Sequence, residues 1–166
     1  NITSPKQYIA GGANVGIKTD TDELDLGILW SESEDTICSG VFSSNSIVSP
    51  SITASKSNLT KNNVRGVVAN SGCANCSIGH QGLIDANDVI KITADYLNAD
   101  PDNFSICSTG IIGEELPMAL IRKNISRINV SIDGGNDFAK SILTTDTKTK
   151  EVAVSVKISN EIITIG

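Results

Sequence analysis

The order of hydrophobic and polar residues along the chain predicts several short strands. Residues 64–69 and 104–107 are apolar-rich runs that predict buried strands, each ending at a polar, glycine-containing turn. Residues 26–30 form a similar short apolar run after an acidic loop. Apolar residues then alternate over 152–158, and a turn separates them from 162–165, which is the pattern of a β-hairpin.

Two longer segments carry apolar residues at helical spacing. Residues 83–97 place them on one helix face, and the sequence Asn-Ala-Asp-Pro at 98–101 ends that helix. A second stripe over 118–128 predicts another helix, with a proline in its first turn. The glycine-rich loop 133–136 contains a possible N-cap and leads into a short helix through 138–142.

Strands interleaved with helices predict a layered α/β fold, a mixed sheet with flanking helices. The chain has 166 residues, about one domain's worth by the usual rule of roughly 150 residues. It contains no internal repeat and no proline-rich linker, so residues 1–166 are expected to form a single domain. Only 4% of the residues are aromatic, so the core must be aliphatic.

The net charge argues against some classes of binding partner. Thirteen basic and 19 acidic residues give a net charge of −6 without any Lys/Arg cluster, which argues against nucleic acid and anionic lipid. The longest apolar run is far too short to span a membrane. No signal peptide is visible, although the chain opens at Asn1 and its start could be trimmed. The expectation is a cytoplasmic protein that acts on small molecules or other proteins.

Two glycine-rich or acidic segments resemble binding loops but lack the required spacing. The sequence Gly-Gly-Ala-Asn-Val-Gly at 11–16 has neither dinucleotide nor P-loop spacing, which favours a plain turn. The acidic stretch 20–25 has leucine at its fifth position and no glycine at its sixth, so it fails as a calcium loop. It is interpreted as a solvated loop.

Cys73 and Cys76, with His80 four residues later, form the one metal-like cluster. Tetrahedral zinc requires four such ligands, and no second pair of this kind exists, so no metal site is predicted. A thioredoxin-like redox pair remains an alternative. The favoured interpretation is that these cysteines pack as small apolar residues.

The residues alone do not supply a complete hydrolase. No Gly-x-Ser-x-Gly motif occurs, and His80 has no evident nucleophile beside it. The segment 108–113, Ser-Thr-Gly-Ile-Ile-Gly, leads from a predicted strand through two glycines toward a helix. Such a turn can present backbone N–H groups to a negative oxygen, although an ordinary turn has the same pattern.

Several motifs in order resemble one enzyme family. Residues 70–82 resemble its "NSGNAN…GxQG" signature, 108–118 its "STGVIGEPLPM", and 142–147 its "IMTTDT". Segments at 10–18 and 40–45 also fit. By these motifs the chain is identified as a member of the ornithine acetyltransferase family, the glutamate N-acetyltransferases of arginine biosynthesis.

The resemblance implies an αββα-type sandwich and a precursor that cuts itself before a threonine. This chain would be the α subunit, and the β chain would supply the N-terminal threonine nucleophile. By a ping-pong route, acetyl would pass from N2-acetyl-L-ornithine to L-glutamate without a cofactor, and acetyl-CoA is a possible further donor. Thr109 and Gly110 correspond to the family's oxyanion hole, and Thr144 corresponds to a substrate-binding threonine.

Two departures from the family pattern matter. Cys73 stands where the family usually has asparagine, and the chain stops at Gly166, before the family's "AKGSGM" segment and cleavage junction. The nucleophile and the substrate-binding lysine that the resemblance implies therefore cannot be assigned to residues of this sequence. The resemblance further implies an assembly of two or more αβ units. The competing hypotheses are a self-cleaving aminopeptidase or amidohydrolase of related fold, and a non-catalytic module that binds metal or a redox partner through Cys73 and Cys76.

Overall fold

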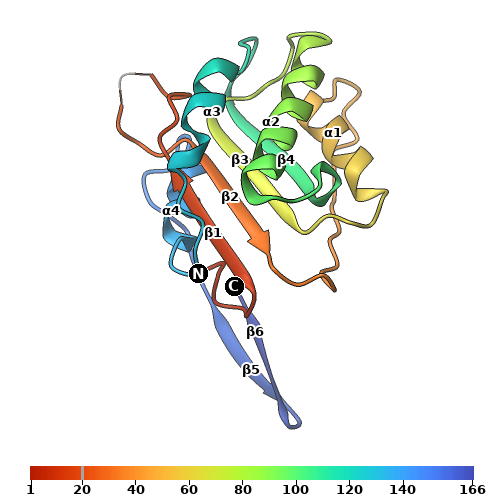
Figure 1. Cartoon of the computed structure of the whole chain (residues 1–166), viewed down its shortest axis with the longest axis vertical. Helices are drawn as coiled ribbons and strands as arrows, with labels where there is room; N and C mark the ends of the chain where they lie inside the picture. Colours follow the sequence, from red (N-terminus) through yellow and green to blue (C-terminus); the bar gives the residue numbers. More distant parts are fainter. Residues whose placement is uncertain (20) are drawn as a thin grey trace.

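The computed structural model describes residues 1–19 and 21–166, and a mixed four-stranded sheet is its centre (Figure 1). The sheet order is β1-β2-β3-β4, with β3 and β4 parallel and the other neighbours antiparallel. These strands are β1 (Tyr8–Ala13), β2 (Leu26–Ser31), β3 (Gly66–Cys73) and β4 (Phe104–Ile111). A separate hairpin of β5 (Val154–Ile158) and β6 (Glu161–Ile165) extends away from the sheet.

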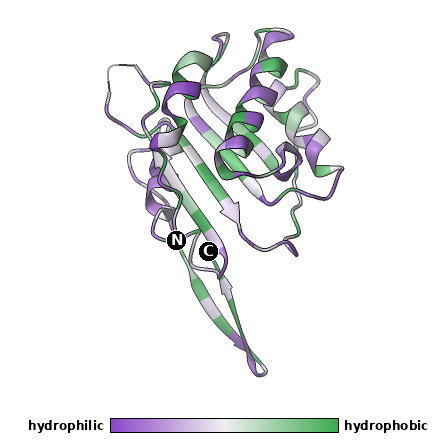
Figure 2. Cartoon of the chain, viewed as in Figure 1, coloured by the Kyte–Doolittle hydropathy of each residue, from purple (hydrophilic) through white to green (hydrophobic). Residues whose placement is uncertain are grey.

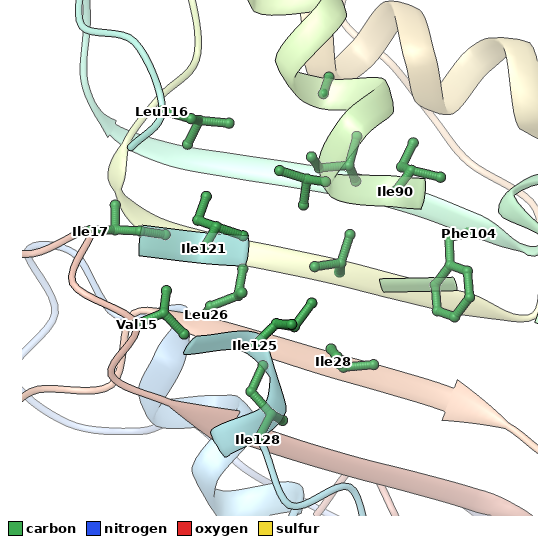
Figure 3. Packing of buried hydrophobic residues seen from close by; sticks show 14 of the residues in the cluster. Val15, Ile17, Leu26, Ile28, Ile90, Phe104, Leu116, Ile121, Ile125 and Ile128 are labelled. Atoms are coloured by element: carbon green, nitrogen blue, oxygen red, sulfur yellow. The ribbon is translucent and has the colours of Figure 1, made fainter. Parts of the chain in front are cut away.

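The main core lies between one face of the sheet and two helical segments. Helix α2 (Gln81–Leu97) packs on β3 and β4, and α3 (Met118–Asn124) continues into the 3-10 turn η2 (Ile125–Arg127). Figure 3 shows Ile121, Ile125 and Ile128 packed beside Leu26 and Ile28 of β2. Burying one such side chain stabilises a fold by about 1.5–3 kcal/mol, so the two predicted helical stripes are the principal source of stability.

The other face of the sheet is covered by α4 (Gly135–Ser141), which packs on β1 and β2. The predicted turn at 11–16 is wrong in its first half, because Gly11 and Gly12 lie inside β1. A Cβ on either glycine would lie 2.4 Å from a backbone oxygen of Asn129 or Asp137. The glycines are therefore needed for close packing across the sheet, which spacing along the chain does not reveal.

Helix α1 (Pro50–Leu59) was not predicted, because its buried face is polar. Ser55 Oγ donates to the Ile106 carbonyl at 2.8 Å and accepts from the Ile106 N–H at 2.9 Å. Asn58 Nδ2 donates to the Phe104 carbonyl at 2.9 Å. These side chains pair the backbone of β4 at the open edge of the sheet, which would otherwise be a site for unwanted strand pairing.

The strands β3 and β4 continue through the segments that were predicted as turns. Their parallel register pairs Asn70 with Ser108, Ser71 with Thr109, and Gly72 with Gly110. These polar residues obtain partners from the neighbouring strand, so tertiary pairing overrides their preference for turns. The motif residues of both strands consequently lie side by side at one edge of the sheet.

Several other predictions are confirmed. Helix α2 ends where Asn98 adopts a left-handed conformation with φ 53°, and Pro101 begins the 3-10 turn η1 (Pro101–Asn103) before β4. The C-terminal hairpin forms as expected, and its apolar residues (green in Figure 2) remain exposed. The irregular segment 37–48 is also exposed, except for the half-buried Cys38. The layered α/β class with a mixed sheet is confirmed. The described residues form one four-stranded sheet with helices on both faces, and their second sheet is only the two-stranded hairpin.

In the part of the chain that the structure describes, no helix has both the length and the apolar character needed to cross a membrane.

Candidate active site

The carboxyl ends of β3 and β4 meet at a pair of glycines. Gly72 and Gly110 are register partners with φ values of +105° and +134°, a region that side chains rarely adopt. A Cβ on Gly110 would lie 2.3 Å from the Gly72 carbonyl carbon. Only glycine fits at position 110, and the pair leaves bare backbone at the edge where parallel strands usually bind ligands.

A buried carboxylate fixes the loop beside these glycines. Asp25 is fully buried, and its two oxygens accept hydrogen bonds from the backbone N–H groups of residues 15, 16, 17 and 18 at 2.7, 3.1, 2.6 and 3.0 Å. The expectation of a solvated acidic loop over 20–25 is therefore wrong for Asp25, while Asp22 and Glu23 are exposed as expected. Asp20 lies outside the described residues.

The loop that Asp25 holds places Lys18 over the glycine pair. The Lys18 Cγ lies 3.1 Å from the point that a Cβ on Gly72 would occupy. The Lys18 ammonium donates to Glu23 Oε2 at 3.1 Å and to the Leu24 carbonyl at 3.3 Å. The Lys18 side chain is only 13% exposed, whereas that of Glu23 is 71% exposed.

These elements enclose a cavity of about 780 Å³ at the end of the sheet. Its wall is formed by residues 16–19, 21 and 23, the ends of β3 and β4, residues of the segment 114–120, and residues 144 and 145 after α4. Its charged lining residues are Lys18, Glu23, Glu114 and Glu115. A cavity of this size with a few polar groups on bare backbone is suited to a small polar metabolite.

A second cavity, of about 430 Å³, lies on the other side of the end of β4. It is lined by α1, the segment 38–43 and residues 105–109. Ser51 of α1 hydrogen-bonds Ser108 at 2.9 Å, and Asn75 Nδ2 donates to Ser51 Oγ at 3.3 Å. This polar chain fixes the backbone immediately before Thr109.

The structure brings two of the three predicted site residues into one cavity. Gly110 and Thr144 line the larger cavity, whereas Thr109 lines the smaller one, and its hydroxyl donates weakly to the Asn70 carbonyl at 3.4 Å. Thr109 and Gly110 thus stand at the boundary between the two cavities. Sequence reasoning missed Asp25, because the sequence alone does not indicate that this aspartate is buried or that it accepts four backbone hydrogen bonds. Lys18, in contrast, lies within the segment 10–18, which resembles the family, so the sequence did offer a signal for it.

The cysteines lie near the larger cavity without forming a metal cluster. Cys73 is buried, and its thiol donates to the Glu114 carbonyl at 3.3 Å. Burial raises the pKa of the Cys73 thiol, a hydrogen bond from the Asn75 backbone opposes this, and the Glu114 carboxylate raises the pKa further. His80 is exposed at the start of α2. Within residues 1–19 and 21–166, no three His, Cys, Asp or Glu side chains come close enough to share an ion.

Comparison with known proteins identifies the family. Residues 9–166 match the sequence model of the ArgJ family. The chain belongs to the ArgJ family. It is 42% identical over 159 residues to the arginine biosynthesis bifunctional protein ArgJ of Dehalococcoides mccartyi, covering 95% of this chain and 39% of that protein. The ArgJ protein of Streptococcus thermophilus is 38% identical over 166 residues, covering 99% of this chain and 41% of that protein.

Solved structures agree with this family assignment. The ornithine acetyltransferase from Mycobacterium tuberculosis, solved in complex with ornithine, superposes with a TM-score of 0.88 at 30% identity, over 92% of this chain and 83% of that chain. The ArgJ protein from Bacillus halodurans gives a TM-score of 0.91 at 28% identity, over 99% of this chain and 86% of that chain. This chain spans about 40% of the length of the curated family members described above.

Proposed function

We propose that this chain is the α subunit of a glutamate N-acetyltransferase, which moves acetyl from N2-acetyl-L-ornithine to L-glutamate in arginine biosynthesis. The observation that carries the proposal is the cavity at the ends of β3 and β4. The segments that build it are those that resemble the family, and Gly110 and Thr144 lie together in its wall. Ornithine, bound in the Mycobacterium tuberculosis relative, is the product expected from such a donor.

The proposed chemistry has two balanced steps. The hydroxyl of the β chain's N-terminal threonine attacks the acetyl carbonyl of N-acetylornithine. The amide C–N bond breaks, and the threonine proton leaves with the ornithine amine. The α-amine of glutamate then attacks the acetyl ester, the C–O bond breaks, and a proton returns to the threonine. The free α-amine of the threonine, whose ordinary pKa is about 7.7–8.0, serves as the local base.

The chain described here contributes the electrostatic part of both steps. Each step passes through a tetrahedral intermediate with a negative oxygen. The Thr109 hydroxyl and the Gly110 N–H are proposed to hold that oxygen, because hydrogen-bond donors aimed at developing charge lower the barrier. Thr144, which lines the same cavity, is proposed to bind substrate. The backbone hydrogen bonds to Asp25 and the side-chain hydrogen bonds of Ser51 keep these walls in place.

The β chain of the same precursor is the proposed partner. The exposed apolar side chains of the hairpin and of segment 37–48 lie where a second chain can cover them. Assembly into two or more αβ units, a cytoplasmic location and acetyl-CoA as a second donor belong to the same proposal. The net charge of −6 fits an enzyme that acts on small molecules.

Purification of the whole gene product tests the proposal. Intact mass and N-terminal sequencing should reveal a second chain beginning with threonine. Incubation with N-acetylornithine should add one acetyl group to that chain, and glutamate should remove it. An active single species ending at Gly166, or release of free acetate without transfer to glutamate, would contradict the proposal, the latter in favour of an amidohydrolase. Replacement of N-acetylornithine with acetyl-CoA in the same assay tests the second donor.

A further inference from the structure

The two substrates of the proposed reaction pose a problem of charge. N-acetylornithine and glutamate share an α-nitrogen and an α-carboxylate, but their side chains end in an ammonium and a carboxylate respectively. In a ping-pong reaction, the same site must accept each of them in turn. A wall with one fixed charge would favour one substrate and repel the other. This inference rests on the proposed function and concerns how the site accepts both.

Lys18 and Glu23 are the oppositely charged pair on the cavity wall. Among the lining residues that the structure describes, theirs is the only ion pair, with 3.1 Å between Lys18 Nζ and Glu23 Oε2. Lys18 is also the only basic lining residue in that part of the chain. Glu114 and Glu115 add only negative charge, so they cannot by themselves favour a substrate carboxylate.

The backbones of both residues are fixed. The Lys18 N–H donates to Asp25, so the lysine stem is held against Gly72. On the other side of the loop, Asn14 Nδ2 donates to the carbonyls of Thr21 and Glu23, at 2.8 Å in each case. The backbone positions of Lys18 and Glu23 are thus each held by a hydrogen bond, so the proposed exchange needs a change only in their outer side-chain torsions.

We propose that the Lys18–Glu23 pair is a charge-adaptive specificity element. When N-acetylornithine binds, the Glu23 carboxylate turns to the substrate ammonium, and Lys18 keeps its bond to the Leu24 carbonyl. When glutamate binds, the Lys18 ammonium pairs with the substrate γ-carboxylate. The exchange costs little on the Glu23 side, because that side chain is 71% exposed and already meets solvent, while the Leu24 carbonyl continues to hold Lys18. With no substrate, the pair is neutral and repels neither.

Opposite single substitutions in the whole αβ enzyme test this element. Lys18→Met should raise the KM for glutamate about three- to tenfold and leave that for N-acetylornithine within about twofold. Glu23→Gln should raise the KM for N-acetylornithine by a similar factor and leave that for glutamate nearly unchanged. Lys18→Arg, which keeps the charge, should restore most of the affinity for glutamate.

An uncharged donor sharpens the test. N-acetylnorvaline has the ornithine carbon skeleton without the ammonium. The wild-type enzyme should prefer N-acetylornithine to N-acetylnorvaline, and Glu23→Gln should lose most of that preference. Lys91→Met and Asp95→Asn form the matched control, because they break an exposed ion pair on α2 that does not line the cavity.

The possible outcomes separate the two proposals. If wild-type enzyme transfers no acetyl from N-acetylornithine to glutamate, the proposed function and this inference both fail. If the wild type is active and both substitutions change both KM values equally, or change neither, the inference alone is overturned. Opposite shifts in the two KM values, with rescue by Lys18→Arg and unchanged controls, support the adaptive pair. If the loop had only a structural role, each substitution would raise the KM values for both substrates in parallel.

Discussion

Strand β2 and the hairpin β5–β6 carry similar side chains but lie in opposite surroundings. In β2, Leu26 and Ile28 are fully buried beneath the helical face. In the hairpin, Val156 and Ile163 face each other across the strand pair and stay 46% and 47% exposed. Apolar side chains thus form strands in both places, but only β2 obtains a covering layer from the described residues.

The comparison teaches that strand formation and core formation are separate events in this chain. A two-stranded hairpin alone is marginally stable in water. Clustered exposed apolar side chains mark interaction surfaces. The hairpin and segment 37–48, where Val41 is fully exposed, are the apolar regions that the described residues leave uncovered. At the end of the sheet that borders the larger cavity, by contrast, the loop is fixed by contacts within the chain, such as the hydrogen bonds to Asp25.

The largest expected effect compares the two regions directly. Ile28→Ala should lower the free energy of unfolding by about 2–5 kcal/mol, because it leaves a cavity in a closed core. Ile163→Ala should change it by no more than about 0.5 kcal/mol in the chain alone, since the side chain is 47% exposed. Urea denaturation of both variants measures the difference. Equal losses would show that the hairpin is already packed, and a larger Ile163→Ala cost in the αβ complex would show where its partner lies.

The next effect concerns the boundary between the two cavities. Thr109→Ala, made in the precursor, should lower kcat about 10²–10³-fold, or about 3–4 kcal/mol, with little change in the KM for N-acetylornithine. A group that binds charge only in the intermediate acts on kcat. Slower self-cleavage is expected as a companion effect if the same donors serve that step.

Thr144→Ala is the matched comparison in the same enzyme. It should act mainly through KM, because this side chain lines the larger cavity and is proposed to bind substrate there. Steady-state kinetics of both variants separate the two roles. Normal maturation and near-normal kcat in Thr109→Ala would mean that the end of β4 is only structural.

The sequence predicts the elements whose burial is apolar and periodic. Helix α2 and the hairpin follow directly from spacing, because their stripes match helical and strand periods. Helix α1 could not be predicted this way, since Ser55 and Asn58 bury polar atoms against the backbone of β4. Polar residues that pair with another element's backbone have no periodic apolar signal.

The site was predictable only through its family-like motifs. Gly110 looks like an ordinary turn glycine until Gly72 is placed beside it by parallel pairing, and that pairing joins segments 38 residues apart in register. Asp25 follows the same logic: its partners lie seven to ten residues earlier, across a loop whose shape the sequence does not state. Long-range geometry, not residue type, defines these contacts.

Asp25 gives the third prediction. Asp25→Asn should lower the free energy of unfolding by about 2 kcal/mol, because an amide cannot accept all four backbone N–H bonds and its NH₂ group faces donors. Asp22→Asn, on the exposed part of the same loop, is the control and should change stability by less than about 0.5 kcal/mol. Chemical denaturation measures both. Equal stability of the two variants would mean that the loop keeps its shape without the carboxylate.

The smallest effect is expected at Cys73, which lines the cavity, and at Cys76. Both thiols are free, and the described residues contain no group of side chains that could hold a metal ion. Replacing them with Ser and Ala should leave activity within about a few-fold, because a small packed thiol has near-isosteric substitutes. Metal analysis accompanies the assay. Loss of bound zinc together with activity would favour the metal-binding module instead.

The pH dependence of stability separates packing from ligation at Cys73. Burial raises the pKa of this thiol, so the folded state holds its proton more tightly than the unfolded state does. The resulting stabilisation is present below the ordinary thiol pKa of about 8.5, and it is lost as the pH rises through the raised pKa. Wild-type stability should therefore fall more steeply than that of Cys73→Ala on the alkaline side. A metal-bound thiolate would reverse this order, because it has no proton to lose and its stabilisation would weaken toward acid pH.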